Sequence, residues 1–166
     1  GPAGQLPSEL LVEPAPAAQT EGRVTRHTVD SAGRTLTLTT EPGLCRDTMT
    51  GMPRPMTASL TVDGRTLTGC AGSPVALLSG AEWSAVEIAS AAVPPGEPVT
   101  LNFEEKGHLA GQGPCNRFMG GFTIGGEGVT LGPLGSTMMA CNDDAMKRER
   151  AFLDLMAKVI RCDIED

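Results

Sequence analysis

Five widely spaced cysteines constrain this chain of 166 residues more than any other feature of its sequence. No two of them form a C-x-x-C pair and the chain has two histidines, so neither a zinc ribbon nor a thioredoxin-like site is indicated. Disulfides in an exported protein explain the pattern better than a metal or a cofactor does, and we expect neither of those. The odd number leaves one thiol unassigned. The cysteines are Cys45, Cys70, Cys115, Cys141 and Cys162.

The charge of the chain argues against nucleic acid as a partner. The net charge is -7 and the isoelectric point is about 4.8, so no basic stripe is available for phosphate contacts. A short basic cluster at Lys147, Arg148 and Arg150 stands among acidic residues and is interpreted as a solvated helix face. No apolar run approaches the roughly 18 residues of a membrane span. We expect membrane association only through a lipid anchor on a removed leader.

The first 22 residues predict a flexible tether. They contain four prolines and few large apolar residues, so they cannot bury enough surface to offset the entropy lost on ordering. Such a tether would suit a protein held at a membrane by a lipidated N-terminus. An ordinary disordered tail explains the composition equally well.

Residues 23–72 predict an N-terminal β-meander. Apolar and polar residues alternate over 24–40 and again over 56–62, with the two-residue period of half-buried strands. Residues 41–43 are typical of a turn. Asp63-Gly64 is a preferred pair for a type I′ turn and predicts a tight hairpin into a further strand.

Residues 73–166 predict a module of short strands followed by one amphipathic helix. The helix is expected to begin after Cys141, capped by Asn142 or Asp143, and to run to about Ile160. Its apolar stripe would pack on the sheet, which makes the fold class α+β, an antiparallel meander packed by one main C-terminal helix and stabilised by disulfides. The strand candidates are residues 83–89, 99–103, 107–111, 122–124 and 129–131.

No catalytic constellation is apparent in the sequence. His27 lies in a polar strand and His108 in an expected turn, and neither context favours a general base. The acidic pairs 104–105 and 143–144 are adjacent in sequence rather than facing each other. No nucleophile elbow, phosphate-binding loop or dinucleotide fingerprint is present. We therefore expect a protein that is not an enzyme.

Two segments carry a family resemblance. Residues 113–122 read Gly-Pro-Cys-Asn-Arg-Phe-Met-Gly-Gly-Phe, and residues 135–141 read Gly-Ser-Thr-Met-Met-Ala-Cys. Together they resemble the META domain family, which includes the bacterial heat-shock lipoprotein HslJ, over about half of the chain. The resemblance implies an envelope-associated α+β domain with no established catalytic residues. It implies structural roles for four residues: Trp83, Asn116, Arg117 and Phe118.

The resemblance also implies a disulfide between Cys115 and Cys141 that ties the helix to the sheet. Two buried free thiols in contact remain the alternative. A weaker resemblance, to bacterial envelope proteins with a Pro-x-Cys-x-Asp-x-Met motif, covers residues 42–49 and a strand that ends in Cys70. It implies a second disulfide between Cys45 and Cys70, which leaves the fifth cysteine free.

The end of the chain departs from the family pattern. META domains usually continue past the helix into two further strands, whereas this sequence offers a single short strand candidate at 159–164. We therefore expect the META-like domain to lack its last two strands. The N-terminal meander is the expected replacement for them.

Three functions are consistent with these features. The first is a non-catalytic lipoprotein or binding module, periplasmic or anchored at the outer membrane of a Gram-negative bacterium, with a role in envelope maintenance or stress and another envelope protein as partner. The second is an inhibitor that plugs a lysozyme or protease with the loop 47–56. The expected binding-loop residues are Asp47, Met49, Met52 and Arg54, with Arg54 exposed at the tip.

The third function is carriage of a hydrophobic ligand or peptide. Methionines are flexible and polarisable, and they suit adaptable apolar grooves. Four of them are expected near the seam between the sheet and the helix: Met138, Met139, Met146 and Met156.

Overall fold

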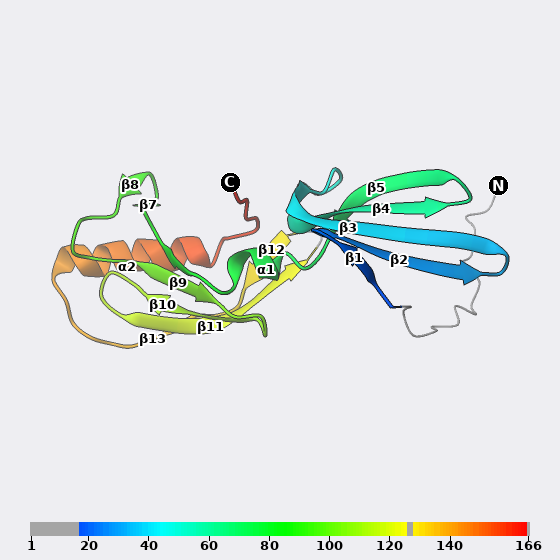
Figure 1. Ribbon diagram of the computed structural model, residues 1–166. Helices are drawn as coiled ribbons and strands as arrows, with labels where there is room; N and C mark the ends of the chain where they lie inside the picture. Colours follow the sequence, from blue (N-terminus) through cyan, green and yellow to red (C-terminus); the bar gives the residue numbers. More distant parts are fainter. Residues whose placement is uncertain (1–16, 126–127, 166) are drawn as a thin grey trace, which may run out of the picture. The chain divides into compact units, whose positions relative to one another are not determined.

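The computed structural model describes residues 17–125 and 128–165, which fall into two compact units (Figure 1). The first unit comprises residues up to Glu41 together with Ala58–Thr68, and the second comprises Pro42–Thr57 and Gly69–Asp166. The fold is α+β, as predicted: its paired strands are mainly antiparallel, and one long helix lies near the C-terminus. The units are interleaved along the sequence because three strands of the N-terminal half contribute residues to both.

A five-stranded sheet occupies the N-terminal half of the chain, with its strands in sequence order. The pairs β1–β2 and β2–β3 are antiparallel. Residues 1–16 of the expected tether lie outside the described residues, and residues 19–21 form the first strand. The strands are β1 (Gln19–Glu21), β2 (Val24–Ser31), β3 (Arg34–Arg46), β4 (Pro53–Val62) and β5 (Arg65–Ala71).

The turns of this sheet were predicted in part. Asp63 and Gly64 have φ angles of 49° and 77°, the left-handed pair that a type I′ turn requires, which confirms the predicted hairpin. The single strand predicted over 24–40 is two strands, because Ala32 and Gly33 form another turn with φ angles of 51° and 76°. The turn predicted at 41–43 is wrong. Strand β3 runs through it, since the fixed φ of proline also fits an extended backbone.

The second unit contains a six-stranded sheet in the order β12-β11-β10-β9-β6, with the short β13 beside β11. A four-residue helix, α1 (Val75–Leu78), precedes this sheet in the chain, and a small hairpin of β7 and β8 stands off the sheet. Its strands are β6 (Glu82–Ser84), β7 (Glu87–Ile88), β8 (Ala91–Ala92), β9 (Thr100–Phe103), β10 (His108–Gln112), β11 (Arg117–Gly125), β12 (Gly128–Leu131) and β13 (Gly135–Ser136).

Helix α2 (Asp143–Met156) packs its apolar side on this sheet and closes the core. The rings of Phe118 and Phe152 join strand to helix with their centroids 5.3 Å apart. Asn142 caps the helix as predicted, since its Oδ1 accepts a hydrogen bond from Ala145 N at 2.8 Å. The fully buried residues of the core cluster are Val99, Leu109, Phe118, Phe122, Phe152 and Met156.

Helix α2 ends earlier than predicted, and the described residues that follow it form no strand. After the helix, the chain makes one backbone hydrogen bond to β12, from Val129 N to the carbonyl of Ile160 at 3.0 Å. The expectation that the N-terminal meander completes the sheet is also wrong. Every described strand of the six-stranded sheet comes from residues 82–136.

Candidate functional site

Two disulfides fix the second unit, and they join the pairs that the resemblances imply. Cys115 and Cys141 lie 5.9 Å apart between their Cα atoms, and Cys45 and Cys70 lie 5.5 Å apart. The alternative of two free thiols at the first pair is therefore wrong. Cys162 is free and half-buried, and burial followed by the nearby charge of Asp163 raises the pKa of its thiol.

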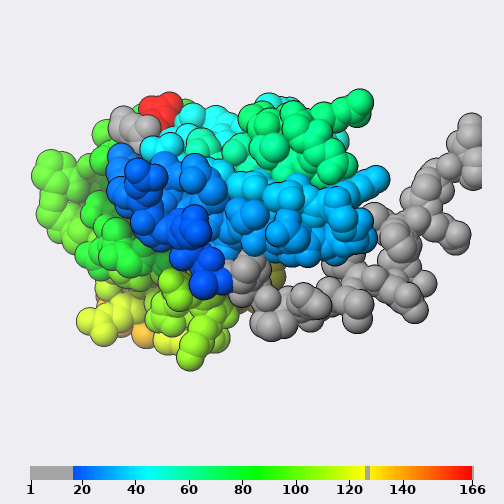
Figure 2. Space-filling view, turned by 45° about the vertical axis from the view of Figure 1, so that its right-hand side comes forward, coloured from blue at the N-terminus to red at the C-terminus, as the bar shows by residue number. Residues whose placement is uncertain are grey.

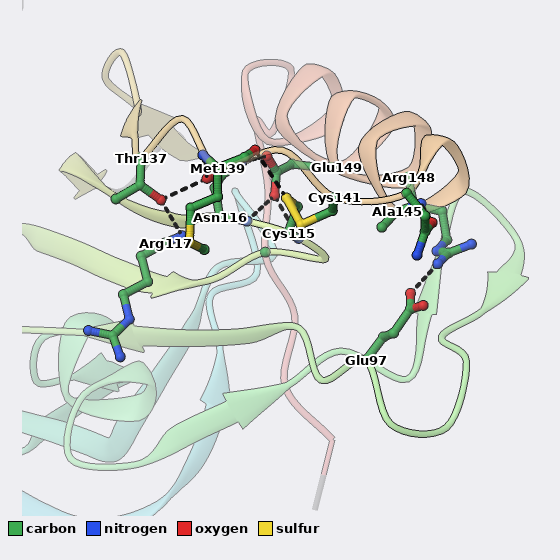
Figure 3. The surroundings of a disulfide bond; sticks show 12 residues. Glu97, Cys115, Asn116, Arg117, Thr137, Met139, Cys141, Ala145, Arg148 and Glu149 are labelled. Carbon is green, nitrogen blue, oxygen red and sulfur yellow. Dashed lines mark hydrogen bonds and ion pairs between the residues drawn. A yellow bond between two sulfur atoms is a disulfide. The ribbon is translucent and has the colours of Figure 1, made fainter.

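Beside the first disulfide, the carboxylate of Glu149 lies buried against the start of β11 (Figure 3). It accepts hydrogen bonds from Cys115 N at 2.8 Å, from Asn116 N at 2.5 Å and from Asn116 Nδ2 at 2.7 Å. Burial acts to raise the pKa of Glu149, but the donors of Asn116 and Cys115 together hold that pKa below its ordinary value. Glu149 is thus ionised near neutral pH, and its carboxylate joins helix to sheet.

Asn116 is the centre of this hydrogen-bond network. Its Oδ1 accepts from Thr137 Oγ1 at 2.8 Å and from Met139 N at 2.7 Å, which fastens the segment before Cys141 to the start of β11. Figure 3 shows the two groups converging on the Asn116 side chain. All the polar atoms of this side chain are therefore engaged in holding the fold.

The other motif residues hold the fold or face solvent. Phe118 is buried in the core. Trp83 is 39% exposed and donates from Nε1 to the carbonyl of Leu78 at 2.8 Å. Arg117 is exposed, and its side chain extends away from the network in Figure 3 rather than bridging to helix α2.

Sequence reasoning missed Glu149, although a signal was present. Glu149 shares one face of α2 with Ala145, Phe152 and Met156, all of which are buried. A carboxylate at helical spacing among apolar residues indicates a buried polar partner, because an unpaired charge in that position would be very costly.

An open apolar pocket of about 240 Å³ lies between the β7–β8 hairpin and helix α2. None of the four methionines expected to form a groove lines it, and Met138 is 97% exposed to solvent instead. The lining residues are Ile88, Ala89, Ala91, Ala92, Val93, Pro94, Glu97, Val99, Pro114, Lys147, Arg148 and Ala151.

The charged groups of the pocket are concentrated on one side. Arg148 Nη2 forms an ion pair with Glu97 Oε2, drawn in Figure 3, whereas Arg148 Nε is buried and finds no partner among the described residues. Lys147 lies on the same helix turn.

The hairpin that bounds the pocket has a strained turn. Ala89 and Ser90 have φ angles of 52° and 64°, a left-handed conformation that costs roughly 1–2 kcal/mol for a residue with a β-carbon. Such strain is often retained at binding sites.

A comparison with protein families decides the classification of this unit. The model of the META domain matches residues 76–166, which is more than half of the chain. The chain belongs to the META domain family. Comparisons with curated proteins and with solved structures give no significant match. The META match begins after β5, so it does not extend to the motif at 42–49.

The loop that precedes β4 lies outside the META match and is held by its own hydrogen bonds. The carboxylate of Asp47 accepts from Thr50 N at 2.8 Å, from Thr50 Oγ1 at 3.0 Å and from Met49 N at 3.0 Å, and these donors lower its pKa. Met49 is 93% exposed and Met52 is buried.

The prediction that Arg54 is exposed at the tip of the loop 47–56 is wrong. Arg54 lies in β4, half-buried, with Nη1 donating to the Gly72 carbonyl at 2.8 Å.

The described part of the META domain chain contains no group of three or more His, Cys, Asp or Glu side chains that could hold a metal ion. None of its described helices is long and apolar enough to cross a membrane.

Proposed function

We propose that this META domain protein is a non-catalytic binding module of the bacterial cell envelope, with a role in envelope maintenance or stress. Its compartment would be the periplasm, or the outer membrane of a Gram-negative bacterium through a lipid anchor. The two disulfides support an oxidising compartment. The observation that carries the binding role is the open apolar pocket beside α2.

Glu149, the buried carboxylate that binds the family motif, is not suited to catalysis. Glu149 accepts three hydrogen bonds from fixed donors, and its lowered pKa keeps it ionised near neutral pH. A general acid or base needs a pKa close to the working pH and a proton within reach of a substrate. Glu149 meets neither requirement, so we assign it, together with Cys115 and Asn116 that bind it, to the fold.

The pocket itself suits a small apolar ligand. Apart from three charged residues, its walls are the side chains of alanine, valine, isoleucine and proline, and burying their apolar surface against a ligand is favourable. The strained turn at Ala89-Ser90 holds one wall, and the ordered helix α2 holds the other. A wall fixed in advance reduces the entropy lost on binding.

Binding of 1-octanol, followed by amide chemical shifts of the full chain, tests this proposal. We expect saturable shifts in residues 88–93 and 147–151, with no comparable shifts in the N-terminal sheet. Ala151→Phe places a ring at the pocket wall and should abolish them. Ala157→Phe is the matched control, because Ala157 is exposed and does not line the pocket. Shifts that Ala151→Phe leaves intact would overturn the proposal.

A second candidate function, inhibition of a hydrolase by the loop 47–56, is favoured by one observation. Met49 is almost fully exposed at a loop that Asp47 holds in one conformation. Met49, not Arg54, would be the residue that enters the enzyme. Incubation with lysozymes and serine proteases tests this function, with Met49→Asp as the control variant. Activity of every hydrolase unchanged by the wild-type chain would count against it.

A further inference from the structure

If the pocket beside α2 binds a ligand, as proposed above, its size restricts what that ligand can be. Ligand sites for drug-sized molecules usually occupy about 300–1,000 Å³. The pocket beside α2 is smaller, about 240 Å³, and most of its wall side chains are aliphatic. A short aliphatic chain fits this space and this chemistry.

The charges around the pocket restrict the occupant further. The charged lining residues are Glu97, Lys147 and Arg148, which leaves one excess positive charge. Glu97 engages Nη2 of Arg148, so it neutralises part of the guanidinium and leaves Lys147 without an ion pair among the described residues. An anionic group complements this side of the pocket.

Arg148 contributes one of the two positive charges at the pocket. Its side chain is 34% exposed, and Nη2 engages Glu97. Nε is buried and has no acceptor among the described residues, so a ligand in the open pocket does not reach it. The guanidinium charge itself favours a carboxylate as its neighbour.

We propose that the pocket binds a short aliphatic monocarboxylate. The chain lies among the aliphatic side chains of the β7–β8 hairpin, and the carboxylate lies beside the positive charges of Arg148 and Lys147. A peptide C-terminus has the same charge but brings backbone amide groups with it. The wall side chains other than these charged ones carry no hydrogen-bonding group, so the free acid suits the pocket better.

Isothermal titration of the full chain with octanoate and 1-octanol tests the anion site. We expect octanoate to bind about tenfold more tightly or better, since hydrogen bonds between charged partners are the strong ones. Arg148→Met should abolish this preference, and Lys147→Met should reduce it several-fold. Arg150→Met is the control, because Arg150 is an exposed cation of the same helix outside the pocket.

The outcomes separate this inference from the proposed function. Equal binding of octanoate and octanol would overturn the anion site while the apolar pocket stands, and binding of neither would overturn both. Tighter binding of N-acetyl-leucine than of octanoate would point to peptide C-termini and overturn the aliphatic assignment. If Arg148→Met fails to fold, Lys147→Met and the salt dependence of octanoate binding decide, because an anion site must weaken as salt rises.

Discussion

At the scale of single residues, Glu149 carries the heaviest structural role among the polar side chains. Replacement of Glu149 by Gln keeps the shape but presents an NH₂ group to the donors of Cys115 and Asn116. We expect the free energy of unfolding to fall by about 1–3 kcal/mol, measured by urea denaturation. The matched control is Glu105→Gln, an exposed position where the change should stay within about 0.5 kcal/mol. Equal effects of the two changes would contradict this role.

The lowered pKa of Glu149 adds a pH dependence. Because the folded-state pKa lies below the ordinary value of 4.5, the unfolded chain takes up the proton more readily. The stabilisation by Glu149 is therefore full above about pH 4.5 and is lost as the pH falls through the folded-state pKa. We expect the stability difference between wild type and Glu149→Gln to shrink between pH 5 and pH 3 in urea denaturation. A difference that stays constant over this range would contradict the assignment.

Gly111 tests the packing of β10 against its neighbours. A β-carbon there would overlap the carbonyl oxygen of Thr100 and lie 2.6 Å from Phe118 Cζ, so Gly111→Ala forces the strands apart. We expect it to lower the free energy of unfolding by about 1–3 kcal/mol. Gly43→Ala is the control, since a β-carbon at Gly43 meets no atom within 4 Å. Thermal unfolding compares the midpoint temperatures of the two variants. Equal midpoints would show that moving the strands apart at Gly111 costs no free energy of unfolding.

At the scale of elements, the disulfide between Cys115 and Cys141 joins β11 to the start of α2. The bridged cysteines are 26 residues apart in the chain, so removing the bridge frees a loop of that size in the unfolded state. The loop-entropy relation gives a loss of about 3–4 kcal/mol for the double change Cys115→Ala and Cys141→Ala, measured by guanidinium denaturation. Cys162→Ala is the control for loss of a cysteine that forms no bridge. A double variant as stable as this control would show that the disulfide between Cys115 and Cys141 does not stabilise the fold.

Elements were predictable where the signal is local. The start of α2 followed from Asn142, whose side chain acts within one helical turn. The end of α2 at Met156 was not predictable, because the apolar spacing continues to Ile160, whereas Ile160 lies beyond the helix and accepts a hydrogen bond from Val129, which is distant in sequence. The turn at Ala89-Ser90 was missed because residues with a β-carbon rarely adopt that conformation.

The candidate site was predictable only in its covalent part. The family motif implied the pairing of Cys115 with Cys141, since motif residues lie near each other in space. The pocket could not be anticipated from local patterns. Its walls come from the hairpin at 88–93, from Pro114 and from helix α2, and periodicity carries no information on how such segments meet.

At the scale of the whole molecule, the two units differ in how much apolar surface they bury. All the described hydrophobic side chains that are fully buried belong to the second unit, from Met52 to Met156. The described side chains of the first unit are half-buried or exposed, and the blue residues at its N-terminal end lie at the surface in the space-filling view (Figure 2). Because burial of apolar surface is the main source of stability, the first unit is held chiefly by its strand pairing and the second by its core.

This difference predicts separate opening of the units. Segments with few buried contacts open at a lower free energy than a packed core, so amides of β2 should exchange with deuterium well before those of β10 and β11. Hydrogen exchange with peptide-level mass spectrometry at neutral pH measures both. Val99→Ala provides the internal check, because Val99 is 2% exposed in the core of the second unit. Val99→Ala should speed amide exchange in β10 and β11 and leave exchange in β2 unchanged. Equal protection of all three strands in the wild-type chain would contradict the prediction, because it would mean that the chain opens as one cooperative unit.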